Sequence, residues 1–176
     1  MDLPSISVRR CIEADSAALA LIGSATFLET FAGVLGGSDI LSHCEQSHSV
    51  ALYAQWLKQL GYEVWLAEME PGAAPVGYMV VAPAQLPLPD ACPADLEIKR
   101  IYLLDKCRGQ GLGKRLVAEA VAYAKQASAS RLLLGVYAHN TNAIAFYQRA
   151  GFEKLGSRQF NVGGKDYDDN IMGMLL

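Results

Sequence analysis

One short segment limits the folds open to this chain more than any other feature of the sequence. It has three glycines at alternate positions between two basic residues, and it reads Arg108, Gly109, Gln110, Gly111, Leu112, Gly113, Lys114. Residues 96–104 before it have the pattern of a strand, and an apolar stripe at helical spacing follows it. Glycines let the backbone approach a ligand, and the unpaired N–H groups of a helix's first turn favour an anion. The segment therefore predicts a strand–loop–helix unit that binds a diphosphate with help from Arg108 and Lys114, the alternative being a plain strand-to-helix turn.

Two common phosphate-binding motifs can be tested against this segment. A P-loop needs a glycine five residues before Gly113 and a Ser or Thr after Lys114, but those positions hold Arg108 and Arg115. The dinucleotide fingerprint needs its third glycine at position 114, and its acidic ribose partner would stand near the next strand, where Arg131 begins an apolar run. Because both motifs fail, nucleoside triphosphates and NAD are poor candidates for the ligand.

Hydrophobic periodicity predicts strands and helices along the whole chain. We expect strands at residues 6–11, 63–68, 76–81, 96–104, 131–137, 152–162 and 167–175, with Gly163 and Gly164 in the last turn. We expect helices over residues 13–31, from Ser38 or Asp39 to Leu60, over 112–124 and over 141–150. The strand at 96–104, the helix after it and the next strand form a parallel βαβ unit. No linker separates a second domain, so we predict a single domain of residues 1–176.

Composition excludes several classes of function. The chain has 176 residues, of which 52% are hydrophobic and 19% are charged, so wholesale disorder is excluded. Its 15 basic and 18 acidic residues give a net charge of −3, which argues against nucleic acid as a partner. The apolar stretch 17–28 is too short to span a bilayer, and the N-terminus lacks the features of a signal peptide. We therefore expect a cytoplasmic protein with no membrane partner.

The cysteines and histidines are too dispersed for a metal centre. The cysteines form no CxxC pair and are expected to be buried reduced thiols: Cys11, Cys44, Cys92 and Cys107. His43 and His48 are five residues apart and would diverge on a continuous helix, and His139 is isolated. No metal site is predicted.

Two segments resemble the cofactor motifs of the GNAT N-acetyltransferase superfamily. Residues 108–113 match its Arg/Gln-x-x-Gly-x-Gly/Ala segment, and residues 140–152 match its second cofactor motif. The resemblance extends from about Ile6 to the end of the sequence, because the expected order of elements agrees. It implies an α/β (α+β) fold, with a mixed, mostly antiparallel sheet of about seven strands, a central parallel βαβ unit and helices on both faces. It also implies acetyl-CoA as cofactor, with CoA as product and the pyrophosphate on the 108–113 loop.

Further site residues follow from the resemblance by position. Ile101, Tyr102 and Leu103 match the strand segment whose backbone pairs with the pantetheine arm of the cofactor. Asn140 matches a polar residue that contacts the cofactor near this arm, and it is equally a good helix N-cap. Tyr147 matches a cofactor-contacting tyrosine to which the family assigns the role of general acid. The alternative is that Tyr147 is a core aromatic residue of its short helix.

Glu97 is the candidate base for acyl transfer to an amine. This reaction needs a neutral amine, a stabilised oxyanion and a proton for the departing thiolate. A primary aliphatic amine has a pKa of about 10.4, so a base is useful at neutral pH. Glu97 lies on the same face of its strand as Leu103, from where it could act through a water molecule. The alternative is an exposed glutamate paired with Lys99 or Arg100.

The amine acceptor is the part of the reaction that the sequence specifies least. The resemblance implies a pocket formed by the first two helices and the last hairpin, which places Phe27, Glu29, Phe31 and Tyr53 in it. Residues 27–31, 96–102 and 134–140 look like the bacterial spermine/spermidine acetyltransferase subgroup, which favours a small polyamine-like amine and leaves a peptide or protein amine open. The alternative function is a non-catalytic acyl-CoA-binding regulatory module. The assembly stays open, with a homodimer among the candidates.

The small net charge hides two local concentrations of charge. Basic residues gather around the glycine segment: Lys99, Arg100, Lys106, Arg108, Lys114 and Arg115. Acidic residues gather near the other end of the chain, at Asp166, Asp168 and Asp169. We therefore expect a cationic site for a small polyanion at the first group, and an acidic entrance for a cationic acceptor at the second.

Overall fold

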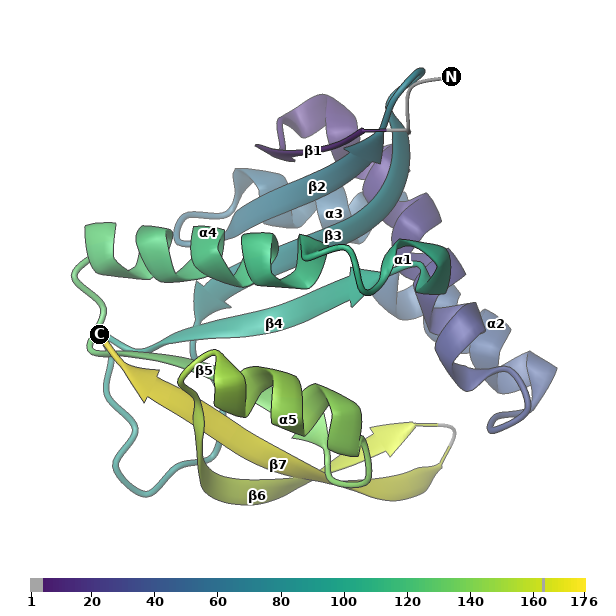
Figure 1. Cartoon of the computed structure of the whole chain (residues 1–176). Coiled ribbons are helices and arrows are strands. Elements are labelled where there is room, and N and C mark those ends of the chain that lie inside the picture. The colour runs from purple at the N-terminus through teal and green to yellow at the C-terminus, as the bar shows by residue number, and fades with distance from the viewer. Residues whose placement is uncertain (1–4, 163) are drawn as a thin grey trace. The chain divides into compact units, whose positions relative to one another are not determined.

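The computed structural model describes residues 5–162 and 164–176 and contains the predicted alternation of strands and helices (Figure 1). In chain order the elements are β1 (Ile6–Arg10), the 3-10 turn η1 (Glu13–Asp15), α1 (Ser16–Phe31), α2 (Gly37–Ser47), α3 (Val50–Lys58), β2 (Glu63–Met69), β3 (Ala74–Pro83), β4 (Leu96–Leu103), the 3-10 turn η2 (Asp105–Cys107), α4 (Leu112–Gln126), β5 (Arg131–Tyr137), α5 (Thr141–Arg149), β6 (Glu153–Val162) and β7 (Lys165–Leu175).

The chain forms two compact units, and strands β3 and β4 contribute residues to both. The first unit contains residues up to 80 together with 100–116, and the second contains residues 81–99 and 117–176. Hydrogen bonds join the described strands in the order β1-β2-β3-β4-β5-β7-β6. β1 pairs with β2, and β7 with both β5 and β6, in antiparallel fashion, whereas β4 and β5 are parallel. The predicted mixed, mostly antiparallel sheet with a parallel βαβ unit is thus confirmed.

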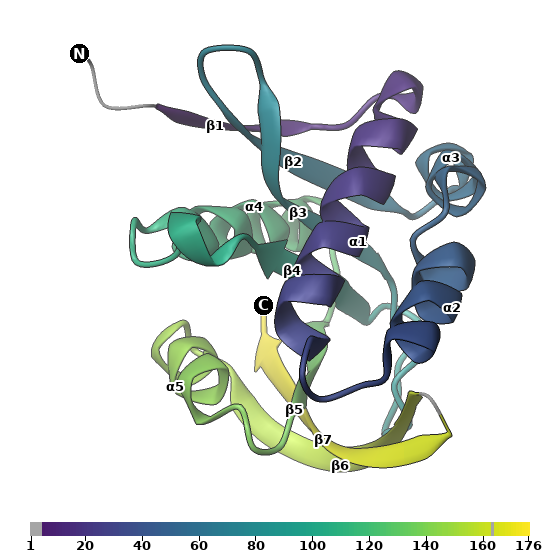
Figure 2. The ribbon, with the colours of Figure 1, turned by 90° about the vertical axis from the view of Figure 1, so that its right-hand side faces the viewer.

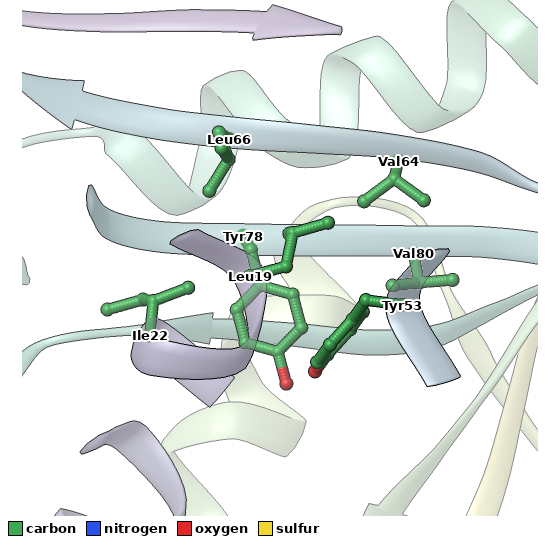
Figure 3. Packing of buried hydrophobic residues seen from close by; sticks show 7 residues of the cluster. All are labelled: Leu19, Ile22, Tyr53, Val64, Leu66, Tyr78 and Val80. Carbon is green, nitrogen blue, oxygen red and sulfur yellow. The ribbon is translucent and has the colours of Figure 1, made fainter. Parts of the chain in front are cut away.

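In the first unit, α1 and α3 cover one face of β2 and β3 (Figure 2). Figure 3 shows the buried side chains that join these elements: Leu19 and Ile22 from α1, Tyr53 from α3, and Val64, Leu66, Tyr78 and Val80 from the strands. Because side chains alternate along a strand, Ala67 lies on the face of β2 opposite to Leu66, where it belongs to a second buried cluster with Val76, Cys107 and Leu112. Helical segments therefore cover both faces, and the second layer fixes the start of α4.

In the second unit, α5 lies against β5 and β7 (Figure 1). Leu133 of β5 and Ile171 of β7 pack on the other face against Leu86 and Leu88, which belong to the irregular connection between β3 and β4. This packing explains how a proline-containing connection without regular structure is held in place. The predicted Gly163–Gly164 turn includes Gly163, which lies outside the described residues.

The prediction of one helix from Ser38 or Asp39 to Leu60 is wrong. The structure has two helices in this region, and the N-cap of α2 is Gly36. Ser49 begins α3, because its Oγ accepts a hydrogen bond from the backbone N–H of Leu52 at 3.2 Å. Three helices therefore precede β2, and residue 48 lies at a break between helices.

The expectation of four buried thiols is also wrong. All four cysteines are free, but only Cys107 is fully buried, whereas Cys11 and Cys44 are half-buried and Cys92 is exposed. Burial raises the pKa of the Cys11 thiol well above its usual range, so this thiol stays protonated. Within residues 5–162 and 164–176, none of the helices has both the length and the hydropathy needed to cross a membrane.

Candidate active site

The glycine segment follows η2 in the first unit and runs into the first turn of α4, which confirms the predicted loop before a helix. Gly109 and Gly111 both have a φ of +76°, which residues with a side chain rarely adopt. A Cβ atom at either position would meet no atom within 4 Å, so the surface beside this backbone is open. The backbone N–H of Arg115 donates to the carbonyl of Gly111 at 3.0 Å, and the N–H groups of the preceding residues belong to the unpaired first turn of α4. The loop thus offers backbone donors at an open surface.

The two basic residues of the segment differ in their surroundings. Arg108 forms an ion pair with Asp105 at 2.7 Å, and both side chains are exposed. Exposed ion pairs contribute little to stability, so an anionic ligand can compete for this guanidinium. Lys114 is exposed and makes no ion pair with any residue that the structure describes. Both cations are therefore available to a ligand.

Gln110 and Leu112 hold the loop in place. The side-chain amide of Gln110 donates to the carbonyl of Lys106 at 3.2 Å. The Leu112 side chain is buried in the cluster that contains Cys107, so only its backbone, like that of Gly113, belongs to the outer turn of the loop. These two side chains therefore give the loop its shape.

Strand β4 continues beyond its parallel partner. The ladder between β4 and β5 pairs Leu96–Ile98 with Leu132–Leu134, whereas β4 runs on to Leu103. The backbone of Ile101–Leu103 lies beyond this ladder. A strand segment outside a ladder can pair with an extended ligand, which is what the resemblance implies for these three residues.

Asn140 and Tyr147 belong to the second unit, where they begin and anchor α5. The Oδ1 atom of Asn140 accepts a hydrogen bond from the N–H of Ala143 at 3.1 Å, which confirms its interpretation as an N-cap. Tyr147 is 9% exposed, and its ring contacts those of Phe146 and Phe152 at centroid distances of 5.2 and 5.8 Å. Its ring thus packs as a core aromatic residue, and the role of its hydroxyl group stays a prediction.

Glu97 is buried in the second unit, with 5% of its surface exposed, in contrast to the exposed glutamate of the alternative interpretation. Its Oε2 atom accepts a hydrogen bond from the backbone N–H of Gln85 at 3.0 Å and lies 3.7 Å from Nζ of Lys99. Lys99 also donates to the side-chain carbonyl of Gln85 at 3.0 Å. The pairing with Lys99 is therefore present, and the carboxylate is held in a fixed position.

Three of the predicted acceptor residues lie along α1 in the first unit. The Phe27 ring is 4.4 Å from that of Phe31 and stacks on His43 at 4.0 Å with an interplanar angle of 12°. The exposed Glu29 accepts a hydrogen bond from the backbone N–H of Asp105 at 2.9 Å. Glu29 therefore fixes the turn that precedes the glycine segment, while Phe27 joins an aromatic group that the sequence did not predict.

The fourth acceptor residue, Tyr53, belongs to a group that we call the Arg100 cluster: Tyr53, His48 and Arg100. Nη1 of Arg100 donates to the Tyr53 hydroxyl at 2.8 Å and to the carbonyl of Ser47 at 2.6 Å, and it lies 3.3 Å from Nδ1 of His48. Nδ1 of His48 is 2.9 Å from the same hydroxyl. A Cβ atom on Gly23 of α1 would come within 2.4 Å of this nitrogen, so α1 closes tightly over the cluster.

The histidines beside Arg100 are neutral at physiological pH. Burial, followed by the charges of Arg100 and His43, lowers the pKa of His48 to about 3. Burial and Arg100 also lower the pKa of His43. Burial raises the pKa of the Tyr53 hydroxyl, so this group stays protonated. The single formal charge of the cluster is therefore the guanidinium of Arg100.

Sequence reasoning missed this cluster for two reasons. Because α2 ends at Ser47, His43 and His48 do not diverge, and their rings lie 5.5 Å apart. In the sequence, Lys99 and Arg100 group with the basic residues around the glycine segment, whereas in the structure Lys99 bonds to Gln85, and Arg100 bonds to residues 47–53. The sequence could have indicated that the two side chains separate, because residues 99 and 100 are adjacent on β4 and therefore lie on opposite faces of the strand.

The acidic group near the C-terminal end is partly neutralised within the second unit. Asp169 is buried and lies 3.3 Å from Nε of Arg158, and burial raises the pKa of its carboxyl group. Asp166 accepts a hydrogen bond from the side chain of Asn161 at 2.8 Å. Asp168 is exposed. A role for these carboxylates in attracting a cationic acceptor stays a prediction.

Comparison with known sequences identifies relatives of this chain. The acetyltransferase (GNAT) family profile matches residues 36–152. An uncharacterized N-acetyltransferase from Lactobacillus delbrueckii subsp. lactis is 37% identical over 84 residues, which are 48% of this chain and 49% of that protein. A spermine/spermidine N(1)-acetyltransferase from Bacillus subtilis (strain 168) is 31% identical over 65 residues, which are 36% of this chain and 43% of that protein. The chain spans about half the length of the curated relatives it matches.

Comparison with solved structures concerns the whole fold. PaiA N-acetyltransferase from Thermoplasma acidophilum, solved in complex with coenzyme A, is 20% identical with a TM-score of 0.75, over 98% of this chain and 99% of that one. A putative acetyltransferase from Salmonella typhimurium, solved with its cofactor acetyl-CoA, is 21% identical with a TM-score of 0.73, over 98% and 94% of the two chains. At these identities the likeness establishes the fold alone. Because the family profile covers more than half of the sequence, the chain belongs to the acetyltransferase (GNAT) family.

Proposed function

We propose that this protein transfers an acetyl group from acetyl-CoA directly to a primary amine. The observation that carries the proposal is the glycine loop, whose open backbone at Gly109 and Gly111 precedes the first turn of α4 and is flanked by Arg108 and Lys114. Backbone N–H groups, a helix N-terminus and two cations suit a pyrophosphate. The donors of this loop therefore fit coenzyme A, which related structures contain.

The remaining cofactor contacts are proposed by position. The backbone of Ile101–Leu103, beyond the ladder with β5, would hold the pantetheine arm, and Asn140 would contact it beside its capping role. When bound, acetyl-CoA supplies the activated thioester. The chain supplies orientation, because β4 and the loop are fixed by the buried cluster around Leu112 and Cys107.

Two side chains are proposed to move protons. The phenolic oxygen of Tyr147 would give its proton to the departing sulfur, and the Phe146 and Phe152 rings hold that side chain in place. The carboxylate of Glu97 would receive the amine proton through a water molecule. Its Oε2 atom is engaged by Gln85 and Lys99, which leaves Oε1 for this task. Backbone N–H groups near Leu103 would stabilise the oxyanion.

The acceptor is proposed from the resemblance. The likeness of three stretches to the spermine/spermidine subgroup favours a small polyamine-like amine, and a matched relative has that name. A peptide or protein amine is the other class, and a regulatory acyl-CoA-binding module is the alternative function. The single domain of residues 1–176 and the cytoplasmic location remain expectations from the sequence pattern, and a homodimer remains one candidate for the assembly.

Thiol release from acetyl-CoA tests the proposed function. The assay scans polyamines, amino acids, aminoglycosides and peptides with purified protein. We expect release that depends on at least one amine. Cofactor binding without turnover across the whole panel would instead support the regulatory module.

Gly111→Glu tests the loop. It places a carboxylate where the pyrophosphate is proposed to bind, so we expect at least a 10-fold loss of acetyl-CoA affinity, measured by titration calorimetry. Gly72→Glu is the matched control, because Gly72 also has a positive φ (+97°) and a Cβ atom there would meet no atom within 4 Å. Normal binding by Gly111→Glu would contradict the assignment of the site.

A further inference from the structure

Arg100 has a hydrogen-bonding edge that the protein does not use. All of its hydrogen bonds to described residues start from Nη1 and end on Ser47, His48 and Tyr53. Its planar group lies over the Trp56 ring, with 4.6 Å from Cζ to the centroid. The Nε and Nη2 atoms, which form the other edge, make no hydrogen bond within residues 5–162 and 164–176. A guanidinium held in this way presents two parallel donors.

Arg100 also lacks the acidic partner that comparable arginines have. Arg9 pairs with Asp15 and Glu68, and Arg131 pairs with Asp95. No carboxylate lies within 4 Å of the Arg100 guanidinium among the described residues. Its titratable neighbours are His43, His48, Tyr53 and Tyr78, and none of them has a negative charge at neutral pH.

Two features stabilise the charge without using the free edge. Ser47 is the last residue of α2, so Arg100 meets the negative end of that helix dipole. The Trp56 ring adds a cation–π contact. The Ser47 carbonyl contacts Nη1, and the Trp56 ring contacts the face of the guanidinium, so neither occupies the edge formed by Nε and Nη2. A half-buried guanidinium whose other edge is empty is suited to bind a carboxylate in bidentate fashion.

We propose that the free edge of Arg100 binds a carboxylate of the acceptor, so that the preferred substrate is an amine that also has an acidic group. The inference rests on the proposed acetyl transfer to an amine. It is supported by position, because Tyr53 of the same cluster and the neighbouring Phe27 are two of the four residues predicted to contact the acceptor. The proposed substrate differs from the polyamine that the resemblance favours, because a polyamine has only positive charges and no carboxylate for Arg100 to bind.

The test compares acceptors that differ only in this charge. The probes are alanine, methionine, 4-aminobutyrate and glycylglycine, each against its own carboxamide, with spermidine added. For at least one pair we expect kcat/KM to be 10-fold or more higher for the carboxylate form. In Arg100→Gln this ratio falls below threefold, because the KM for the carboxylate form rises more than the KM for the carboxamide form. Arg100→Lys keeps the charge without the planar donor pair and gives an intermediate ratio.

Arg10→Gln is the matched control, because Arg10 also lies over a tryptophan, Trp65, and its change leaves the ratio unaltered. Ratios within threefold for every wild-type pair, a preference for spermidine, or a carboxylate preference that persists in Arg100→Gln would each overturn the inference. Calorimetry of the same probes on the CoA-loaded protein separates the two proposals. If CoA binds and no amine is acetylated, the proposed function fails, and the inference is then decided by whether the carboxylate forms bind more tightly than the carboxamides.

Discussion

Tyr147 is held by ring packing, which allows its hydroxyl group to be removed with little disturbance. Tyr147→Phe keeps the contacts with Phe146 and Phe152. If the hydroxyl protonates the leaving thiolate, we expect kcat to fall by about 100-fold while the affinity for CoA changes less than threefold. Steady-state kinetics and calorimetry measure the two quantities. Tyr123→Phe on α4 is the control, and an unchanged kcat in Tyr147→Phe would remove the residue from the acid role.

Glu97 is engaged on one carboxylate oxygen, and the substitution by glutamine retains a carbonyl acceptor for the N–H of Gln85. Glutamine cannot take up the amine proton, so the amine must lose it to solvent. We expect the rise of kcat/KM with pH to shift to higher pH in Glu97→Gln, with a loss of about 10-fold or more at pH 7. Glu119→Gln on the exposed side of α4 serves as the control. A pH profile that does not move would exclude Glu97 from the mechanism.

The start of α3, just after the break from α2, has a side-chain cap at Ser49. Ser49→Ala removes the hydrogen bond from the N–H of Leu52 to the Ser49 Oγ atom. We expect the free energy of unfolding to fall by about 1 kcal/mol, measured by urea denaturation. Ser38→Ala is the control, because Ser38 lies inside α2 and makes no capping bond, and its expected change is within about 0.5 kcal/mol. Equal losses in the two variants would contradict the cap at Ser49.

At the scale of elements, local patterns predicted most of the fold. The strands follow from the alternation of apolar residues, and the βαβ unit follows from the strand, helix and strand patterns between residues 96 and 137. The α2–α3 break was missed because Tyr53 and Trp56 continue an apolar stripe that also suits a single long helix. The tertiary contact of Arg100 with Ser47, and not periodicity, marks where α2 ends.

The parts of the candidate site whose residues are close together in the sequence could be predicted from it. The glycine loop and the Asn140 cap are contained in short segments, and the structure places both as expected. The Arg100 cluster was not predictable, because Arg100 bonds to residues about 50 positions earlier in the chain. The spacing of residues along the sequence does not predict such contacts. The alternation of side chains along β4 predicts only which face of the strand Arg100 lies on.

At the scale of the whole molecule, the net charge of −3 hides an uneven pairing of charges. Arg9 and Arg131 are each neutralised by carboxylates within 3 Å, whereas the cluster around Arg100 has no acidic member among the described residues. Structural arginines and an arginine available to a ligand are thus distinguished by their partners. This pairing of charges also determines how the free energy of unfolding changes as the pH is lowered.

His48 makes the folded protein sensitive to mild acid. Its folded pKa of about 3 lies below the ordinary value of 6.5, so below pH 6.5 the unfolded chain takes up a proton that the folded one does not. The free energy of unfolding therefore falls as the pH is lowered from about 6.5 to about 4, by up to about 1.4 kcal/mol per pH unit for this residue. His43 contributes in the same direction. Urea denaturation at intervals between pH 7.5 and pH 4.5 measures this slope.

The two carboxylates that Arg9 and Arg131 bind titrate in a different pH window, which separates their contribution from that of the histidines. Arg9 and Arg131 lower the pKa values of Asp15 and Asp95 from 3.8, so the stability from these pairs is present above that value and is lost only in stronger acid. His48→Asn offers an amide oxygen to Tyr53 and Arg100 without a titrating group, and should flatten the slope between pH 6.5 and pH 4.5. His139→Asn, the same substitution at an exposed position outside the Arg100 cluster, is the control. A slope that His48→Asn leaves intact would mean that His48 is not held neutral in the Arg100 cluster.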